Sequence, residues 1–188
     1  MQPKFIAVMG PSGVGKSTLM HELRTMDSRF VLIQTHVTRM LRPGETDRVS
    51  LPYRDLLEMR KKGEVLQLND VYGNYYAALP VGQIRDAFLN GQFPMCDYKI
   101  PFVADLKTEI GSVFCVYVLP PNFAALAERL KSAGRNVDES RSAEDALEIR
   151  NLDTKYAGLI DLKIVNEDGR QREVAEAIRS AYLKSIES

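Results

Sequence analysis

The feature that most constrains the fold is the segment GPSGVGKS at residues 10–17. It matches G-x-x-x-x-G-K-[ST] at every fixed position and lies between a short apolar run, KFIAVMG, and a segment with helical spacing of its apolar residues. Glycines let the backbone N–H groups turn inward around phosphate oxygens, and the N-terminus of the following helix adds positive potential. The pattern predicts a strand, a phosphate loop and a helix, and ATP as the ligand. The alternative is a glycine-rich turn that only joins strand to helix.

Two side chains of this loop have specific expected roles. Lys16 would bring a mobile charge to the outer phosphates and act in catalysis, and the Ser17 hydroxyl would bind Mg²⁺. The ATP-binding residues expected here are Gly10, Pro11, Ser12, Gly13, Val14, Gly15, Lys16, Ser17 and Thr18. Many nucleotide-driven proteins share such a loop, so it predicts binding and leaves the reaction open.

Along the rest of the chain, short apolar runs alternate with segments of helical spacing. Strands are expected in KFIAVMG, FVLIQ, FPMCDYKI, SVFCVYVLP and LKIVN, with helices between and after them. This order predicts an α/β fold with a central parallel sheet flanked by helices. Polar, turn-rich residues 36–92 are expected to form an inserted lobe of a single domain, 1–188, whose core would be about 1–35 and 93–188. The segment SAGRNVDESRSAED is charged and shows no apolar periodicity.

Composition excludes several classes of partner. Lys and Arg, 25 in number, balance 25 Asp and Glu, and no basic run occurs, so neither nucleic acid nor a membrane surface is an expected partner. No apolar run approaches the length of about 18 residues that a membrane span needs, and no signal peptide is recognisable. Cys96 and Cys115 lie in apolar runs and are expected to be buried thiols in a reducing compartment. A cytoplasmic protein is therefore expected.

Three further motifs follow the phosphate loop: VTRMLRPGE, GNYYA and KIVNED. Together with the loop, and in this order, they resemble the guanylate kinase family over nearly the whole chain. The resemblance implies a P-loop kinase with an acceptor-binding lobe and a short lid at about residues 133–148. It also implies phosphoryl transfer from ATP, with Mg²⁺, to a nucleoside monophosphate, GMP or dGMP. We expect a monomer or a homodimer.

By this resemblance Arg39, Arg42 and Tyr76 would hold the phosphate of the acceptor. An arginine fork matches phosphate oxygens in pairs, and a tyrosine hydroxyl adds a neutral donor, so the phosphate can be oriented as well as attracted. The acceptor-binding residues implied are Thr35, Arg39, Arg42, Gln67, Tyr76, Asp97 and Lys99. The alternative is that the arginines are solvated and the tyrosines pack the lobe.

The resemblance also implies a metal site and a lid. Asp97 would join Ser17 at the metal, or cap a turn at the end of its strand. Arg135 and Arg150 would act with Lys16 and Arg39 in catalysis as the lid closes; Arg141 competes with Arg150, and a surface position is the alternative for each lid arginine. Asn166 would lie beside the adenine, or end its strand in a turn.

The base-reading positions depart from the family pattern. The family's glutamate falls on Gln67, its serine on Ala78, a second aspartate on Lys99, and a phosphate-binding tyrosine on Leu51. Guanine would lose a charged acceptor, which predicts that GMP is a weakened substrate or not the true one. The alternatives are another phosphorylated acceptor such as ribose 1,5-bisphosphate, and a protein-binding module without catalysis. Arg48 has no counterpart in the family pattern and is expected to be solvated.

Overall fold

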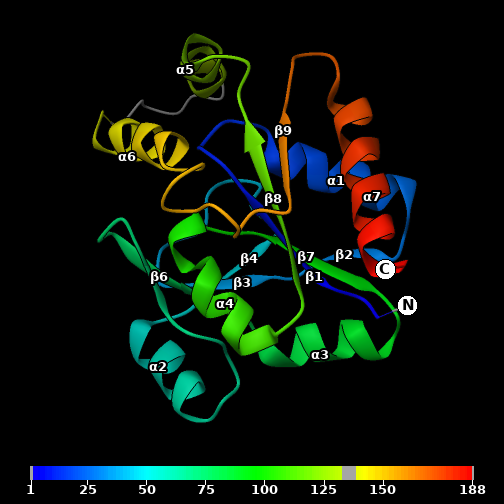
Figure 1. Ribbon diagram of the computed structural model, residues 1–188. Helices are drawn as coiled ribbons and strands as arrows, with labels where there is room; N and C mark the ends of the chain where they lie inside the picture. Colours follow the sequence, from blue (N-terminus) through cyan, green and yellow to red (C-terminus); the bar gives the residue numbers. More distant parts are fainter. Residues whose placement is uncertain (1, 133–138, 188) are drawn as a thin grey trace.

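A five-stranded parallel sheet forms the centre of the molecule in the computed structural model, which describes residues 2–132 and 139–187 (Figure 1). Its strand order is β2-β7-β1-β8-β9, and every neighbouring pair is parallel. The strands are β1 (Phe5–Met9), β2 (Phe30–Leu32), β7 (Phe93–Asp97), β8 (Val113–Leu119) and β9 (Leu162–Val165). Each lies in an apolar run in which the sequence predicts a strand, so the expected α/β fold with a central parallel sheet is confirmed.

Helices cover both faces of this sheet. On one face lie α1 (Lys16–Met26) and α7 (Gln171–Glu187), side by side in Figure 1; on the other lie α3 (Val81–Leu89) and α4 (Val103–Ile110), which follows a 3-10 turn, Ile100–Phe102. The fully buried β1 serves both layers because its side chains alternate between the faces. Its loop is therefore anchored by a strand with no exposed edge or face.

A second, four-stranded sheet lies beside the core, in the order β4-β3-β6-β5. Its strands are β3 (Thr35–Val37), β4 (Arg48–Ser50), β5 (Asn69–Val71) and β6 (Tyr75–Ala78), and α2 (Tyr53–Lys61) packs next to them. The β3–β4 pair is parallel, whereas β6 is antiparallel to both β3 and β5. No strand of this sheet is predicted from the sequence, because strands this short carry too few residues for alternation to be visible.

Two helices lie near the end of the central sheet at which β8 terminates, α5 (Phe123–Ser132) and α6 (Glu139–Arg150) (Figure 1). The charged segment SAGRNVDESRSAED shows no apolar periodicity, yet its last residues, 139–145, form the first part of α6. The pattern is missing because α6 buries polar side chains, Asp145 and Glu148, where a periodic pattern would show apolar ones. Residues 133–138, with the lid candidate Arg135, lie outside the described part.

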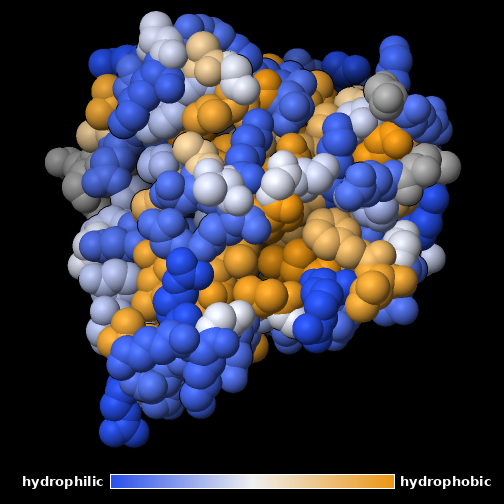
Figure 2. All heavy atoms as spheres, turned by 60° about the horizontal axis from the view of Figure 1, so that its bottom comes forward, coloured by the Kyte–Doolittle hydropathy of each residue, from blue (hydrophilic) through white to orange (hydrophobic). Residues whose placement is uncertain are grey.

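Both cysteines are buried and unpaired, as the sequence predicts. No helix among residues 2–132 and 139–187 is long and apolar enough to cross a bilayer. The lower face of the molecule, toward which α3 and α4 lie, carries a broad apolar area (Figure 2). There a groove of about 490 Å³ is lined by Leu66, Phe88, Leu89 and Ile110, among others. It shares no lining residue with the cleft described next.

Candidate active site

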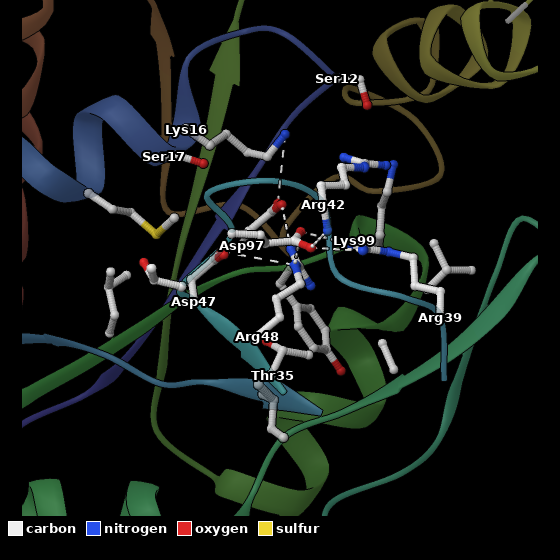
Figure 3. A pocket seen from close by; sticks show the side chains of 18 of the residues that line it. Ser12, Lys16, Ser17, Thr35, Arg39, Arg42, Asp47, Arg48, Asp97 and Lys99 are labelled. Atoms are coloured by element: carbon white, nitrogen blue, oxygen red, sulfur yellow. Dashed lines mark hydrogen bonds and ion pairs between the residues drawn. The ribbon is translucent and has the colours of Figure 1, made fainter. Parts of the chain in front are cut away.

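One cleft of about 420 Å³ joins the phosphate loop to the small sheet. Lys16 and Ser17 of the phosphate loop line this cleft, and so do Arg39 and Arg42 of the lobe (Figure 3). The cleft lies at the carboxyl ends of β1 and β7, where parallel sheets of this kind bind their ligands. A bound molecule in this space would meet the loop and the small sheet together.

The phosphate loop adopts the conformation that its glycines allow. Gly10 and Gly15 have φ angles of 135° and 99°, which other residues rarely adopt. A Cβ on Gly10 would lie 2.3 Å from the carbonyl oxygen of Val118, and one on Gly15 would lie 2.4 Å from Nδ2 of Asn166. Both glycines are therefore required by the packing around the loop as well as by its backbone angles.

Lys16 extends back over the loop. Its Nζ donates hydrogen bonds to the carbonyl oxygens of Gly10 and Pro11, at 2.7 and 2.9 Å, and lies 3.7 Å from Oδ1 of Asp97. The ammonium group is thus held at the mouth of the loop, next to the carboxylate at the end of β7. Ser17 and Asp97 line the same cleft, and a hydroxyl and a carboxylate are hard oxygen ligands of the kind that Mg²⁺ prefers.

Asn166 and Arg129 donate hydrogen bonds to the backbone of the phosphate loop. Asn166 is buried, and its Nδ2 donates to the carbonyl oxygen of Val14 at 2.7 Å. Arg129 of α5 donates from Nη1 to that same oxygen at 3.3 Å and from Nη2 to the carbonyl oxygen of Asn166 at 2.8 Å. Asn166 is a residue that the family resemblance implies, whereas Arg129 was not predicted, since its only signal in the sequence is its place in the helix before the proposed lid.

A carboxylate from α6 also reaches the loop. Oδ2 of Asp145 accepts a hydrogen bond from the backbone N–H of Ser12 at 3.0 Å, and Oδ1 accepts one from the Tyr72 hydroxyl at 3.2 Å. Nζ of Lys99 lies 3.7 Å from Oδ1 of the same group. Beside it, burial raises the pKa of Glu148. The part of α6 next to the loop therefore presents carboxylates.

The arginines of the first lobe motif are ordered around Glu45. Arg39 donates to both Glu45 oxygens, at 2.8 and 2.6 Å, and the backbone N–H of Arg42 donates to Oε2 at 3.0 Å. Burial opposes ionisation of Glu45, but hydrogen bonds from Arg39 and Arg42 and the charges of Arg39 and Arg48 outweigh it, and lower its pKa to about 2. Glu45 thus occupies, as an internal anion, the centre of a cationic cluster.

Arg48 is largely buried, and the expectation that it would be solvated is wrong. Only 11% of its side chain is exposed. Nη2 donates to Oδ2 of Asp97 at 3.1 Å, and Nε lies 3.3 Å from Oε1 of Glu45. Pairing of β4 with β3 turns Arg48 into the cleft, because Thr35, its partner in the ladder, also lines it. Nothing local in a polar segment distinguishes such an arginine from a surface one.

The two tyrosines of GNYYA point to different places. Tyr75 lines the cleft, and the guanidinium carbon of Arg39 lies 5.1 Å from its ring centre. Tyr76, which the resemblance implies as the phosphate ligand, packs its ring on Tyr53 at 4.8 Å and is not among the described residues that line the cleft. Adjacent strand residues face opposite ways, so one tyrosine packs the lobe while the other faces the cleft.

The inner end of the cleft is lined by uncharged side chains. Thr35, Asn69, Ala78 and Tyr98 line it, whereas Gln67 is exposed and does not. Nδ2 of Asn69 donates to the Tyr98 hydroxyl at 2.9 Å, and Oδ1 of Asn69 is buried with no partner in the described structure. Asn69 could not be predicted from the sequence, since only the tertiary fold brings β5 against the chain after β7.

The remaining predicted residues lie at the margins of the cleft. Lys99 lines it, with Nζ 4.2 Å from the centre of the Tyr72 ring. Arg150 is exposed at the end of α6 and is not among the described residues lining the cleft. The phosphate loop, Thr35, Arg39, Arg42, Asp97 and Lys99 are therefore brought together, and Gln67, Tyr76 and Arg150 are not.

Known proteins resemble this chain along almost its full length. The family model described as guanylate kinase matches residues 2–181. A guanylate kinase from Cupriavidus pinatubonensis is 30% identical over 182 residues, which cover 94% of this chain and 83% of that protein. One from Thiobacillus denitrificans is 34% identical over 166 residues, covering 86% and 77%.

The fold is shared as well. The crystal structure of guanylate kinase from Anaplasma phagocytophilum superposes with a TM-score of 0.74 at 18% identity, covering 97% of this chain and 86% of that one.

Proposed function

Since the chain belongs to the guanylate kinase family, we propose that it transfers the terminal phosphoryl group of ATP to GMP or dGMP. The family match supports the coarser activity, that of a nucleoside monophosphate kinase. The single observation that carries the proposal is the continuity of one cleft from Lys16 to the arginine cluster. Phosphoryl transfer requires donor and acceptor phosphates in line and close together, with their charge neutralised; a single cleft lined by Lys16 and by the arginines supports this proposal.

At the donor end, the loop N–H groups and Lys16 would hold the ATP phosphates. Ser17 and Asp97 would hold Mg²⁺, which supplies charge neutralisation between the phosphates. Lys16 leaves the carbonyl oxygens of Gly10 and Pro11 for a phosphate oxygen, and Asn166 and Arg129 keep the loop in shape meanwhile. In this proposal residues 133–148 act as the lid, which limits transfer to water.

At the acceptor end, Arg39, Arg42 and Tyr75 would orient the phosphate of the monophosphate. A phosphate would compete with Glu45 for the arginine forks, since both are anions that accept pairs of hydrogen bonds. Residues 36–92 form the acceptor-binding lobe in this account. Held in this way, the acceptor phosphate has an oxygen free to face the donor.

At the inner end, the base would lie against Asn69 and Tyr98. The bare Oδ1 of Asn69 is an acceptor, and guanine presents N–H donors at N1 and N2 on one edge. A buried acceptor left unpaired costs about 1–3 kcal/mol, which a base N–H would recover. Asn69 thereby offers guanine an acceptor that the exposed Gln67 does not.

The test is ATP turnover with a panel of acceptors: GMP, dGMP, IMP, AMP, CMP, UMP, dTMP and ribose 1,5-bisphosphate. We expect the highest kcat/KM with GMP and dGMP. A clear preference for ribose 1,5-bisphosphate or another nucleotide would replace the acceptor and keep the kinase. Tight peptide binding without turnover of any acceptor would make the chain a protein-binding module instead.

We further propose a cytoplasmic enzyme, a monomer or a homodimer, without nucleic-acid or membrane partners. The balanced charge, 25 basic against 25 acidic residues, supports a small anion as the ligand. Size-exclusion chromatography with light scattering, with and without nucleotides, tests the oligomeric state.

A further inference from the structure

Arg48 lies in the middle of a row of alternating charges that runs through the cleft (Figure 3). Lys16 and Arg48 approach the carboxylate of Asp97 from opposite sides, at 3.7 and 3.1 Å. From Arg48 the row continues to Oε1 of Glu45 at 3.3 Å, and from Glu45 to Nη2 of Arg39 at 2.6 Å. Asp97 therefore lies between Arg48 and Lys16, and Glu45 lies between Arg48 and Arg39.

In the reaction proposed above, a phosphoryl group moves from the loop near Lys16 to a phosphate held by Arg39. Arg48 forms ion pairs with Asp97, which is the partner of Lys16, and with Glu45, which is the partner of Arg39. In the transition state the negative charge is spread over the three oxygens of that group, and a fixed cation beside them stabilises it more than it stabilises bound ATP. An arginine serves this purpose well because its planar fork meets two oxygens at once.

Among its described residues, the helix α6 presents negative charge and not positive charge next to the phosphate loop. In the described part of α6, the buried side chains nearest the loop are Asp145 and Glu148, and Asp145 accepts from Ser12. Arg150 is exposed and does not line the cleft. Arg48 contacts both Asp97 and Glu45, and it comes from the lobe rather than from α6.

Burial of Arg48 is itself informative. Removing a guanidinium from water is costly, and here three carboxylates compensate it: Asp97, Glu45 and, at 3.9 Å, Asp47. In the proposed function, Asp97 would bind Mg²⁺, and the acceptor phosphate would compete with Glu45 for Arg39. Arg48 pairs with both carboxylates, so it can exchange a carboxylate oxygen for a phosphate oxygen when the ligands bind.

We propose that Arg48 is a catalytic residue that contacts the phosphoryl group during its transfer. The bond between the γ-phosphorus and the bridging oxygen breaks, and that oxygen leaves with the electron pair as part of ADP. The bond from an oxygen of the acceptor phosphate to the γ-phosphorus forms at the same time; the acceptor reacts as its dianion, so no proton is transferred. The proposal rests on the kinase function proposed above.

The first experiment compares Arg48→Gln and Arg48→Lys with wild type in steady-state kinetics with ATP and GMP. The glutamine variant keeps a hydrogen-bond donor toward Asp97 but removes the positive charge. The lysine variant keeps the charge but removes the planar guanidinium group. We expect kcat to fall about 100-fold to 1,000-fold for Gln and less for Lys, with both KM values changed less than about threefold. Arg54→Ala is the matched control, an exposed arginine of the same lobe that does not line the cleft, and its kinetics should equal wild type.

A purely structural role predicts a different result. If Arg48 only ties the lobe to the core, both variants would lower the midpoint of thermal unfolding and leave kcat unchanged below that temperature. A rise in KM for GMP with kcat unchanged would make Arg48 a binder of the ground state. Either result overturns the proposal.

A second measurement does not depend on the identity of the acceptor. Binding of MgADP with aluminium fluoride, a mimic of the transferred group, is compared with binding of MgADP alone. We expect Arg48→Gln to weaken the fluoride complex at least about tenfold and to leave MgADP affinity within about twofold. Equal loss in both complexes, or no loss, would overturn the proposal. Wild-type inactivity with every monophosphate would contradict the proposed function, and this measurement would still decide the role of Arg48.

Discussion

Asp145 of α6 accepts a hydrogen bond from the backbone N–H of Ser12, across the mouth of the phosphate loop. The carboxylate thereby occupies an N–H group that would bind an ATP phosphate in the proposed function, and Tyr72 and Lys99 contact the same carboxylate. In the proposed function, ATP would have to displace this internal anion before the loop could bind it fully.

Asp145→Ala is therefore expected to bind ATP more tightly. Loss of a competing hydrogen bond worth about 1 kcal/mol corresponds to roughly a fivefold decrease in the dissociation constant. Titration calorimetry with MgATP measures it. Glu144→Ala, an exposed carboxylate on the same helix, is the control for net charge, and an equal gain there would mean that charge and not displacement is responsible.

Lys16→Ala is expected to lower kcat at least about 100-fold while the protein stays folded. In the proposed reaction, Lys16 of the loop stabilises the negative charge of the phosphoryl group in the transition state. Its loss removes hydrogen bonds to the carbonyl oxygens of the buried Gly10 and Pro11, so the unfolding temperature should fall, although the buried strand β1 keeps the core folded. Coupled ADP release and a thermal melt test both statements; substantial residual turnover would contradict the first.

Asn166→Ala is expected to destabilise the fold by about 1–3 kcal/mol and to raise KM for ATP. The buried amide donates to the Val14 carbonyl at 2.7 Å, and its loss leaves that oxygen with the longer bond from Arg129. Asn166→Asp should be worse than Ala at neutral pH, because a carboxylate oxygen would face the carbonyl oxygen. Urea unfolding of both variants gives the order, and the reverse order would argue against the hydrogen bond.

Asn69→Ala is expected to lower kcat/KM for GMP about tenfold to a hundredfold and to reduce the preference for GMP over IMP, which lacks the N2 amino group. Tyr98→Phe is the matched variant, since it removes the same hydrogen bond and keeps the amide. If both variants lose GMP activity equally, Asn69 acts through its packing and not through the base.

Glu45 should contribute to acid sensitivity. Its pKa, about 2 in the fold, lies below the ordinary value of 4.5, so its contribution to stability is complete above about pH 4.5 and is lost as the pH falls toward 2. Glu45→Gln should cost about 1–3 kcal/mol at pH 7, and the difference from wild type should shrink across that window. Unfolding free energies from pH 7 to pH 2 check this; a difference independent of pH would contradict it.

Much of the fold could be predicted because its signals are local. The segment GPSGVGKS carries its own geometry, and runs such as SVFCVYVLP are apolar because strands of a covered parallel sheet are buried on both faces. The helix α6 and the strands of the small sheet could not be predicted in this way. The strands are too short for a pattern, and α6 buries carboxylates, which composition assigns to the surface.

The sequence by itself determined the phosphate loop, the parallel core and the family, because these depend on residues adjacent in the chain or repeated at a regular spacing. The tertiary structure alone decided the polar site: Arg48 is largely buried, Tyr75 and not Tyr76 faces the cleft, and Asp145 reaches Ser12. The physical reason is that burial of a charged or polar side chain is favourable only where partners from distant segments meet it. No single segment of the chain contains those partners.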